Sequence, residues 1–374
     1  MGLRGILLRY AARRPRPLVV AVPGFTGVRL AAEAELRRRG WRPALSPAEA
    51  DLLVVCGVPG HDLSQAVETV WDEMPNPRAR ADLADVIGVP SALDDASARL
   101  ADEPAQLRDA AARTSFTPQA PTGHGETDHG DMDHGHMGHG DMGHGGMGHG
   151  DMAGHEGHGG GHEHHMMGDP YGLAMADRAP DRDGLKLDVL HVPFGPVLAD
   201  WPAGLRLTFT LQGDVVQDVE SETLGGGAVG ERFWDETHET HEPHEPQETN
   251  AAAARLDSLA RLLAVAGWTG QAARARILRD EVLAGRVEPR RLHKFTRRTR
   301  RSRTLRWMLA DVNLGETNAW TRVCEWLAEI DGEPRSHVPS APLEELLVGV
   351  DVAAARLVVA ALDPDAEGAV AAHA

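Results

Sequence analysis

The segment Ala50-Asp-Leu-Leu-Val-Val-Cys-Gly-Val-Pro-Gly60 predicts a buried β-strand over residues 51–56 that ends in a tight turn. A second apolar run, Leu18-Val-Val-Ala-Val22, comes earlier in the chain, and turn residues follow it directly. It predicts another buried strand.

Helices are expected between and after these strands. Residues 28–39 and 63–74 carry helical apolar patterns, and residues 82–112 predict one or two further helices. Because strand and helix alternate, residues 1–112 are expected to form an α/β domain. Its parallel sheet with covering helices would be flavodoxin-like.

The middle of the chain has a different composition. Residues 113–169 are dominated by Gly, His, Met and Asp, in imperfect five-residue units such as Gly138-His-Gly-Asp-Met142. Almost no apolar side chain is available to offset the ordering of the backbone, which costs about 1–2 kcal/mol per residue. This stretch therefore predicts a disordered His/Met/Gly-rich linker.

Residues 170–224 again carry sequence patterns that are typical of a folded segment. Apolar and polar residues alternate over 205–211, a Gly-Asp turn follows, and residues 215–222 predict the return strand of a β-hairpin. Residues 225–250 are acidic and rich in His, Glu and Pro, and they predict a second linker.

From residue 251 onward the apolar period becomes helical. Residues 251–374 predict an antiparallel helical bundle, with a final strand over 356–362. Hairpin and bundle together predict a C-terminal α+β domain, distinct from the N-terminal α/β domain.

Composition limits the functional classes. The chain has 56 acidic and 38 basic residues, and its net charge of −18 argues against general nucleic-acid binding. Its two cysteines, Cys56 and Cys324, form no disulfide framework and are typical of a reducing cytoplasm. We expect a cytoplasmic protein. Residues 1–16 are basic and partly amphipathic, which leaves two interpretations: peripheral contact with the inner face of the cell membrane, or a frayed terminus.

The predicted strand over residues 51–56 and the segment after it resemble a known family. The strand, the turn and then Val70-Trp-Asp-Glu-Met-Pro-Asn-Pro-Arg78 arrive in order. Residues 1–85 thereby resemble the cluster-bearing B-type subunit of NADH:quinone oxidoreductase (complex I) and the small subunit of membrane [NiFe]-hydrogenases. The resemblance implies cysteine ligands in the loop 22–29, and that loop has none. It implies further cysteines after the strand that follows the motif, where Arg78 leads into Ala-Arg-Ala-Asp-Leu83, again with none. Cys56 lies on the strand and is interpreted as a small buried hydrophobic residue.

A later stretch resembles the partner of that family. Gly195-Pro-Val-Leu-Ala-Asp-Trp-Pro-Ala-Gly-Leu-Arg-Leu207 is similar to the start of the D-type subunit, which is related to the hydrogenase large subunit. That family has two histidines facing a quinone headgroup, and Leu198 and Pro202 occupy those positions here. Near the end, Leu357-Val-Val-Ala-Ala-Leu-Asp-Pro364 resembles the C-terminal motif of the same family, without the nickel-binding cysteines that follow it in hydrogenases.

Together these matches indicate a degenerate fusion of two subunits that are neighbours in the same complexes. A [4Fe–4S] cluster needs four thiolates, so no iron–sulfur cluster is expected on this chain. We expect no catalytic and no cofactor-binding residues, and we expect partners among the other subunits of a respiratory or hydrogenase-type redox complex.

The linker carries candidate metal ligands. Imidazole binds Cu(II), Ni(II) and Zn(II), and thioether favours Cu(I). The sequence predicts weak, multi-site binding of nickel, copper or zinc in this tract, although a linker whose histidines are incidental is an equal alternative. The predicted ligands are His124, His129, His134, His136, His139, His144, His149, His155, His158, His162, His164, His165, Met132, Met137, Met142 and Met147.

Residues 286–306 hold a dense run of arginines. Such a run is usually a solvated helix face. In a chain this acidic, a dock for its own acidic residues 218–248 or for an acidic partner is the second option.

Three hypotheses about function follow. The first is a non-catalytic subunit or assembly factor of a complex I-like or hydrogenase-like enzyme. The second is a protein that handles nickel, copper or zinc through the tract. The third is an oxidoreductase subunit that works with a cluster on a partner chain.

Overall fold

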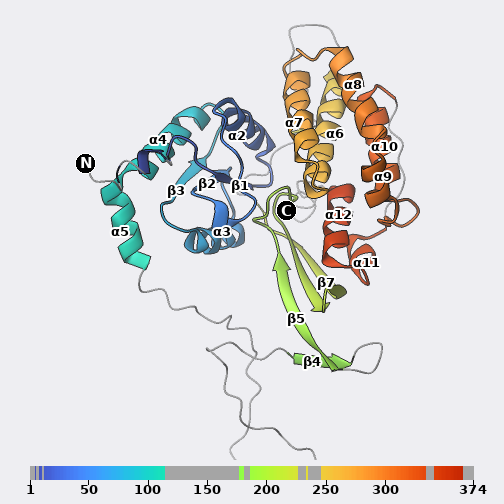
Figure 1. The fold of residues 1–374 in the computed structure, drawn as a ribbon, viewed down its shortest axis with the longest axis horizontal. Coiled ribbons are helices and arrows are strands. Elements are labelled where there is room, and N and C mark those ends of the chain that lie inside the picture. Colours follow the sequence, from blue (N-terminus) through green and yellow to red (C-terminus); the bar gives the residue numbers. More distant parts are fainter. Residues whose placement is uncertain are drawn as a thin grey trace, which may run out of the picture. The chain divides into compact units, whose positions relative to one another are not determined.

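Three short strands form a parallel sheet in the order β1-β2-β3 (Figure 1). They are β1 (Pro17–Ala21), β2 (Leu52–Cys56) and β3 (Ala79–Leu83). β2 is the central strand and all five of its residues are buried. The predicted parallel sheet with helices in the N-terminal part is confirmed. Continuous apolar runs such as those of β1 and β2 need cover on both faces of the sheet.

The computed structural model describes residues 5, 8–10, 12–113, 177–180, 186–225, 233–234, 246–333 and 341–364. The described segments before residue 114 and after residue 176 belong to one compact unit. Within these ranges, every helix is too short or too polar to cross a membrane.

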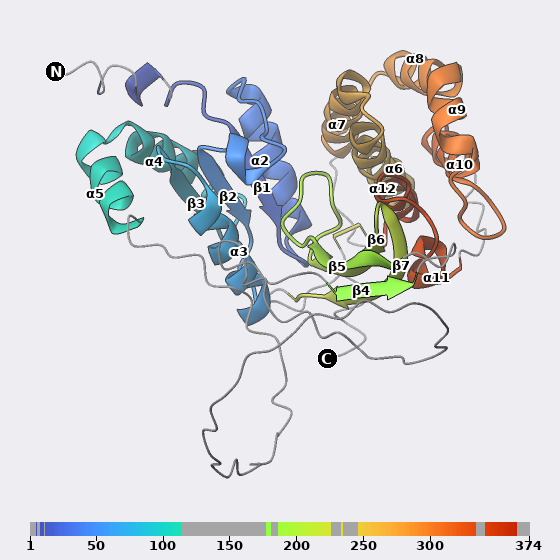
Figure 2. The same cartoon turned by 60° about the horizontal axis from the view of Figure 1, so that its bottom comes forward.

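Helices cover both faces of the parallel sheet, and successive side chains of β2 point alternately to one face and the other. Leu52, Val54 and Cys56 pack on one face, with α2 (Thr26–Arg38) and α4 (Val89–Ala101). Leu53 and Val55 pack on the other face, in one cluster with Leu63 and Val67 of α3 (His61–Glu73). Figure 2 shows α3 on the opposite side of the sheet from α2 and α4. A short 3-10 turn, η1 (Pro47–Glu49), precedes β2, and α5 (Glu103–Arg113) ends this part of the chain.

A four-stranded antiparallel sheet follows, in the order β4-β5-β6-β7. Its strands are β4 (Asp177–Pro180), β5 (Lys186–Phe194), β6 (Leu205–Gln212) and β7 (Val215–Thr223). The predicted hairpin corresponds to β6 and β7, and the inward residues of β6 alternate as expected. β5 was not predicted, because most of its residues are exposed and it lacks a clean apolar alternation.

The C-terminal region is helical, as predicted. The inward side chains of α6 (Leu256, Leu259, Leu262 and Leu263) are fully buried and share one core with β6. Figure 1 shows α6 beside α7, with the remaining helices following toward the C-terminus. The helices are α6 (Pro246–Val265), α7 (Thr269–Leu283), α8 (Pro289–Arg300), α9 (Arg303–Ala310), α10 (Ala319–Ile330), α11 (Leu343–Leu347) and α12 (Val352–Leu362).

Three sequence-based assignments of secondary structure are corrected. Residues 356–362, predicted as a strand, lie in α12, where Asp351 Oδ1 accepts a hydrogen bond from the backbone N–H of Ala354 at 2.8 Å and caps the helix. An apolar run this short does not distinguish strand from helix by periodicity. Residues 82 and 83 end β3 and do not begin a helix. The predicted linker 225–250 is shorter than expected, since α6 begins at Pro246, a residue type suited to a first helical turn.

Arg78, the last residue of the Met-Pro-Asn-Pro-Arg segment, fastens α5 to the parallel sheet. Its side chain is 3% exposed and donates from Nε and Nη2 to the two carboxylate oxygens of Asp109, at 2.8 and 3.1 Å. Its guanidinium carbon lies 4.0 Å from the ring centroid of Trp71 on α3. The backbone of Arg78 exchanges two further hydrogen bonds with the buried amide of Gln106, each 2.9 Å long.

Arg78→Lys is therefore expected to lower the free energy of unfolding by about 1–3 kcal/mol, because an ammonium group cannot reproduce the planar fork on Asp109. Arg80→Lys is the matched control. Arg80 pairs with Glu68 and Asp82, which are more than half exposed, and its loss should cost less than about 1 kcal/mol. Urea unfolding of both variants measures the difference, and equal effects would contradict the anchoring role of Arg78.

Candidate functional site

The carboxyl ends of β1, β2 and β3 are the place where an open parallel sheet usually binds ligands. The loop after β1 brings Phe25 against Gly57, the residue that follows β2. Gly57 has a φ of +120°, and a Cβ there would lie 2.3 Å from the Phe25 side chain. Glycine is therefore required at this position, and an aromatic ring occupies the space between the two loops.

Segments from the second half of the chain also contact this edge. Gly60 donates its backbone N–H to the carbonyl oxygen of Gly225 at 3.1 Å, and Leu224 belongs to the same apolar cluster as β1 and β2. A Cβ on Gly204 would lie 2.6 Å from Pro23. The end of the parallel sheet is thus packed against the residues that flank the β6–β7 hairpin.

A buried group of charged side chains lies beside this contact. Arg29 of α2 donates to both oxygens of Asp257 on α6, at 2.7 and 3.3 Å. Arg279 of α7 donates to Asp257 at 2.5 Å and to Glu33 of α2 at 2.9 Å. The side chains of Arg279 and Asp257 are 0% and 2% exposed. We call Arg29, Glu33, Asp257 and Arg279 the central quartet.

Further ion pairs extend the central quartet. Arg37 pairs with Asp280, Arg276 pairs with Asp200, and Arg261 lies 2.9 Å from Asp363. The full network then has five guanidinium groups and five carboxylates, so its formal charges balance: Arg29, Arg37, Arg261, Arg276, Arg279, Glu33, Asp200, Asp257, Asp280 and Asp363.

The pKa shifts in the central quartet follow from this pairing. Burial alone would raise the pKa of Glu33, but Arg279, Arg29 and Arg276 lower it to about 2. Burial also opposes ionisation of Asp257, and the charges of Arg29 and Arg279 nevertheless hold its pKa well below the usual range. Both carboxylates stay ionised at neutral pH, which makes them poor general acids and, since arginines already engage them, poor general bases.

The two cysteines are placed unfavourably for metal or nucleophilic chemistry. Cys56 is fully buried in β2, and burial raises the pKa of its thiol to about 12. Burial also raises the pKa of Cys324, on α10. The thiolate is the form that attacks or binds metal, so both shifts disfavour those roles.

Leu198 and Pro202, which the resemblance aligns with two histidines, lie in a tight loop before β6. Gly195 has a φ of +79°, and a Cβ there would lie 2.4 Å from Nε1 of Trp201, which donates to the carbonyl oxygen of Leu205 at 2.8 Å. Pro202 is buried, and Leu198 packs against the core of the C-terminal region. These side chains stabilise the start of the hairpin and offer no polar group to a ligand.

Asp363, from the C-terminal Leu-Asp-Pro segment, also has protein partners. It ends α12 in the left-handed conformation, with a φ of 48°. Its Oδ2 accepts a hydrogen bond from Ser258 Oγ at 2.5 Å, and Arg261 of α6 pairs with it as well. Asp363 therefore ties the end of α12 to α6.

All sixteen predicted metal ligands, from His124 to His165, lie outside the described residues. Within the part of the chain that the structure describes, no group of three His, Cys, Asp or Glu side chains is arranged to hold a metal ion. The metal prediction for the tract stays a prediction.

Comparison of the chain with protein-family models, with curated proteins and with solved structures finds no match in any of the three. The resemblance to redox subunits therefore rests on the motifs quoted above.

Sequence analysis did not identify the central quartet. One signal was present: Arg29 and Glu33 are four residues apart, so they share one face of α2 and can pair there. A second was Asp257, an acidic residue directly after Leu256 on the strongly apolar α6. The pairing of these residues across 228 positions of sequence was not deducible from spacing.

Asp257→Asn is expected to lower the free energy of unfolding by about 3–5 kcal/mol, because it leaves Arg29 and Arg279 buried without their shared carboxylate. Asp94→Asn is the control, since Asp94 is 71% exposed and pairs with Arg39 at the surface; its cost should stay below about 1 kcal/mol. Chemical denaturation measures both, and a mild effect of Asp257→Asn would show that the quartet is not a structural anchor.

The stability of the protein should also depend on pH through Glu33. The folded state holds the pKa of this carboxyl at about 2, below its ordinary value of 4.5. The unfolded chain therefore takes up the proton first as the pH falls, and the stabilisation present above about pH 4.5 is lost toward about pH 2. Glu33→Gln should flatten this part of the curve of unfolding free energy against pH. An unchanged decline in the variant would assign the effect to other carboxyls.

Proposed function

We propose that this chain is a non-catalytic subunit or assembly factor of a redox complex of the NADH:quinone oxidoreductase or [NiFe]-hydrogenase kind. Its work would be to present two subunit-like parts, one resembling the B-type and one the D-type subunit, in a fixed arrangement for docking. A flavodoxin-like relationship of the N-terminal sheet belongs to the same proposal.

The main observation in support of the proposal is the contact between the N-terminal parallel sheet and the segments that flank the β6–β7 hairpin. The carboxyl end of the parallel sheet is packed by Phe25 and by the segments around Gly204 and Leu224. In the families that the sequence resembles, such positions would serve cofactor chemistry, and here they serve packing.

The motif residues support the same interpretation. Arg78 holds α5, Trp201 closes the loop before β6, and Asp363 fastens α12. Each of these residues belongs to a quoted resemblance, and each has a structural partner in this chain. This chain keeps the motif residues for folding and lacks the cysteines that the resemblance implies in the loop 22–29 and directly after Arg78. Such a protein fits a scaffold better than a catalyst.

A second candidate function is the handling of nickel, copper or zinc. It is favoured by one observation, the concentration of twelve histidines and repeated methionines between residues 124 and 165. In this alternative the tract would be the working part, and the folded parts would direct it to a client protein.

The test is a pull-down from the native host with the intact chain and with a variant that lacks residues 120–168, followed by metal analysis and identification of partners. We expect both versions to retain the same redox subunits, and the deletion to lower bound nickel, copper or zinc because it removes all sixteen predicted ligands. Partners that disappear with the tract, or an intact protein that arrives loaded with one of these metals, would favour the metal-handling function instead.

A further inference from the structure

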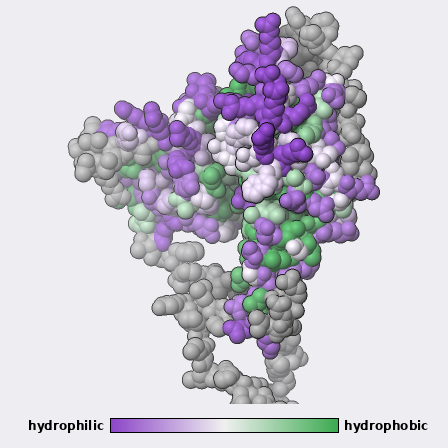
Figure 3. All heavy atoms as spheres, turned by 45° about the vertical axis from the view of Figure 1, so that its right-hand side comes forward, coloured by the Kyte–Doolittle hydropathy of each residue, from purple (hydrophilic) through white to green (hydrophobic). Residues whose placement is uncertain are grey.

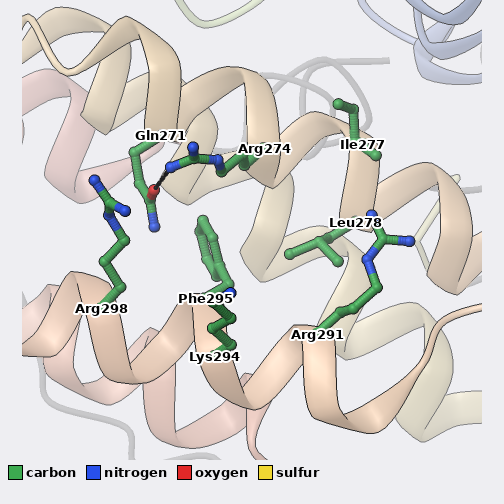
Figure 4. Close-up of a pocket in the computed structure, with 8 residues that line it drawn as sticks. All are labelled: Gln271, Arg274, Ile277, Leu278, Arg291, Lys294, Phe295 and Arg298. Carbon is green, nitrogen blue, oxygen red and sulfur yellow. Dashed lines mark hydrogen bonds between the residues drawn. The ribbon is translucent and has the colours of Figure 1, made fainter.

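Helices α7 and α8 line an open cavity of about 300 Å³ that shares no residue with the charge network (Figure 4). Its floor is apolar, formed by Ile277, Leu278 and Phe295. Leu278 and Phe295 are each 4% exposed, so their side chains already belong to the core. A cavity of this size accommodates one bulky apolar side chain of another molecule.

The rim of the cavity is cationic. Arg291, Lys294 and Arg298 lie at positions i, i+3 and i+7 of α8, which places them along one face of that helix. Arg274 of α7 faces them across the cavity, and its Nη1 donates to Gln271 Oε1 at 3.1 Å (Figure 4). Gln271 is fully buried and donates in turn to Thr299 Oγ1 at 2.9 Å, so the polar end of the cavity is held in place.

Most of these cations have no carboxylate partner in the part of the chain that the structure describes. Arg291 pairs with Glu281 at 2.6 Å. For Arg274, Lys294 and Arg298, no carboxylate among the described residues lies within ion-pair distance. Arg298 instead lies 5.9 Å from the ring centroid of Trp268.

The surrounding surface continues this character. Arg290, Arg297 and Arg301 are exposed on or next to α8, and Figure 3 shows strongly hydrophilic residues gathered at the end of the molecule where Figure 1 places that helix. In a chain with a net charge of −18, such a local concentration of cations gives this face a sign opposite to that of the whole molecule.

We propose that the groove between α7 and α8 is a docking site for an acidic segment of a partner protein. The segment would place one bulky apolar side chain on the half-buried Ile277 of the floor and pair flanking carboxylates with Arg274, Lys294 and Arg298. This inference rests on the groove alone and is independent of the proposed function.

The apolar floor favours a protein over other anionic partners. A polyphosphate backbone would satisfy the cations but leave the recessed floor uncovered. A single-stranded base needs an exposed aromatic face on which to stack, and Phe295 is almost completely buried. A planar lipid surface cannot enter a recessed cavity. Charge at the rim with an apolar anchor at the centre is instead the usual composition of a protein interface.

The experiment is selection of a random-sequence peptide library against the full-length protein, followed by fluorescence anisotropy with an enriched peptide. We expect enriched peptides to combine one bulky apolar residue with flanking Asp and Glu. Replacing that apolar residue by Ala in the peptide should weaken binding about tenfold, the usual scale for losing an interface anchor.

Protein variants assign the binding to the groove. Lys294→Glu with Arg298→Glu changes the rim, and Ile277→Asn changes the half-buried floor; each should weaken binding about tenfold or more. Arg303→Glu with Arg306→Glu removes two exposed cations of α9 outside the cavity and should change binding less than about threefold. Circular dichroism checks that all variants fold.

Several outcomes would overturn the proposal. The first is a selection that enriches no acidic peptides. The second is an equal loss of peptide affinity in the α8 and α9 variants. The third is equal affinity for the enriched peptide and for the peptide in which Ala replaces its apolar residue. Tighter binding of single-stranded oligonucleotide or of phosphatidylglycerol vesicles than of the enriched peptide would also overturn it, and would assign the groove to that partner.

Discussion

The sharing of the Asp257 carboxylate between Arg29 and Arg279 is the interaction on which the arrangement of the two halves depends. A guanidinium or carboxylate group removed from water is strongly destabilising unless its partner lies at hydrogen-bond distance. Arg279 is completely buried, so α7 is stable in its position only while Asp257 of α6 and Glu33 of α2 are also in theirs. The requirement couples three helices from opposite halves of the sequence.

The same requirement explains why the network offers little chemistry. Each carboxylate of the central quartet is engaged by at least one arginine, and their pKa values are lowered accordingly. A catalytic acid or base needs a pKa near the working pH and an accessible proton. The quartet has neither property, and its effect is on geometry and on stability at low pH.

Sequence patterns predicted a strand or helix correctly where a single periodicity of apolar residues dominated the segment. The buried residues of β2, the alternation along β6 and the leucine face of α6 all correspond to the predicted periods. The predictions failed where two signals competed. The last helix, α12, was taken for a strand because Val358 and Val359 favour extended structure, whereas the Asp351 cap and neighbouring alanines favour a helix. β5 was missed because its neighbours, and not its own pattern, place it in the sheet.

The sequence by itself determined which residues are available, including two cysteines and a tract rich in histidine and methionine. It also predicted an N-terminal α/β region with a parallel sheet and a helical C-terminal region. Composition and short-range periodicity carry that information, since both are read without knowing the fold. Only the tertiary structure decided that Arg29 meets Asp257, that Gly204 approaches Pro23, and that cations of α8 line a groove against α7. These contacts join residues far apart in the chain, and a buried charge reveals its role only through the partner that burial requires.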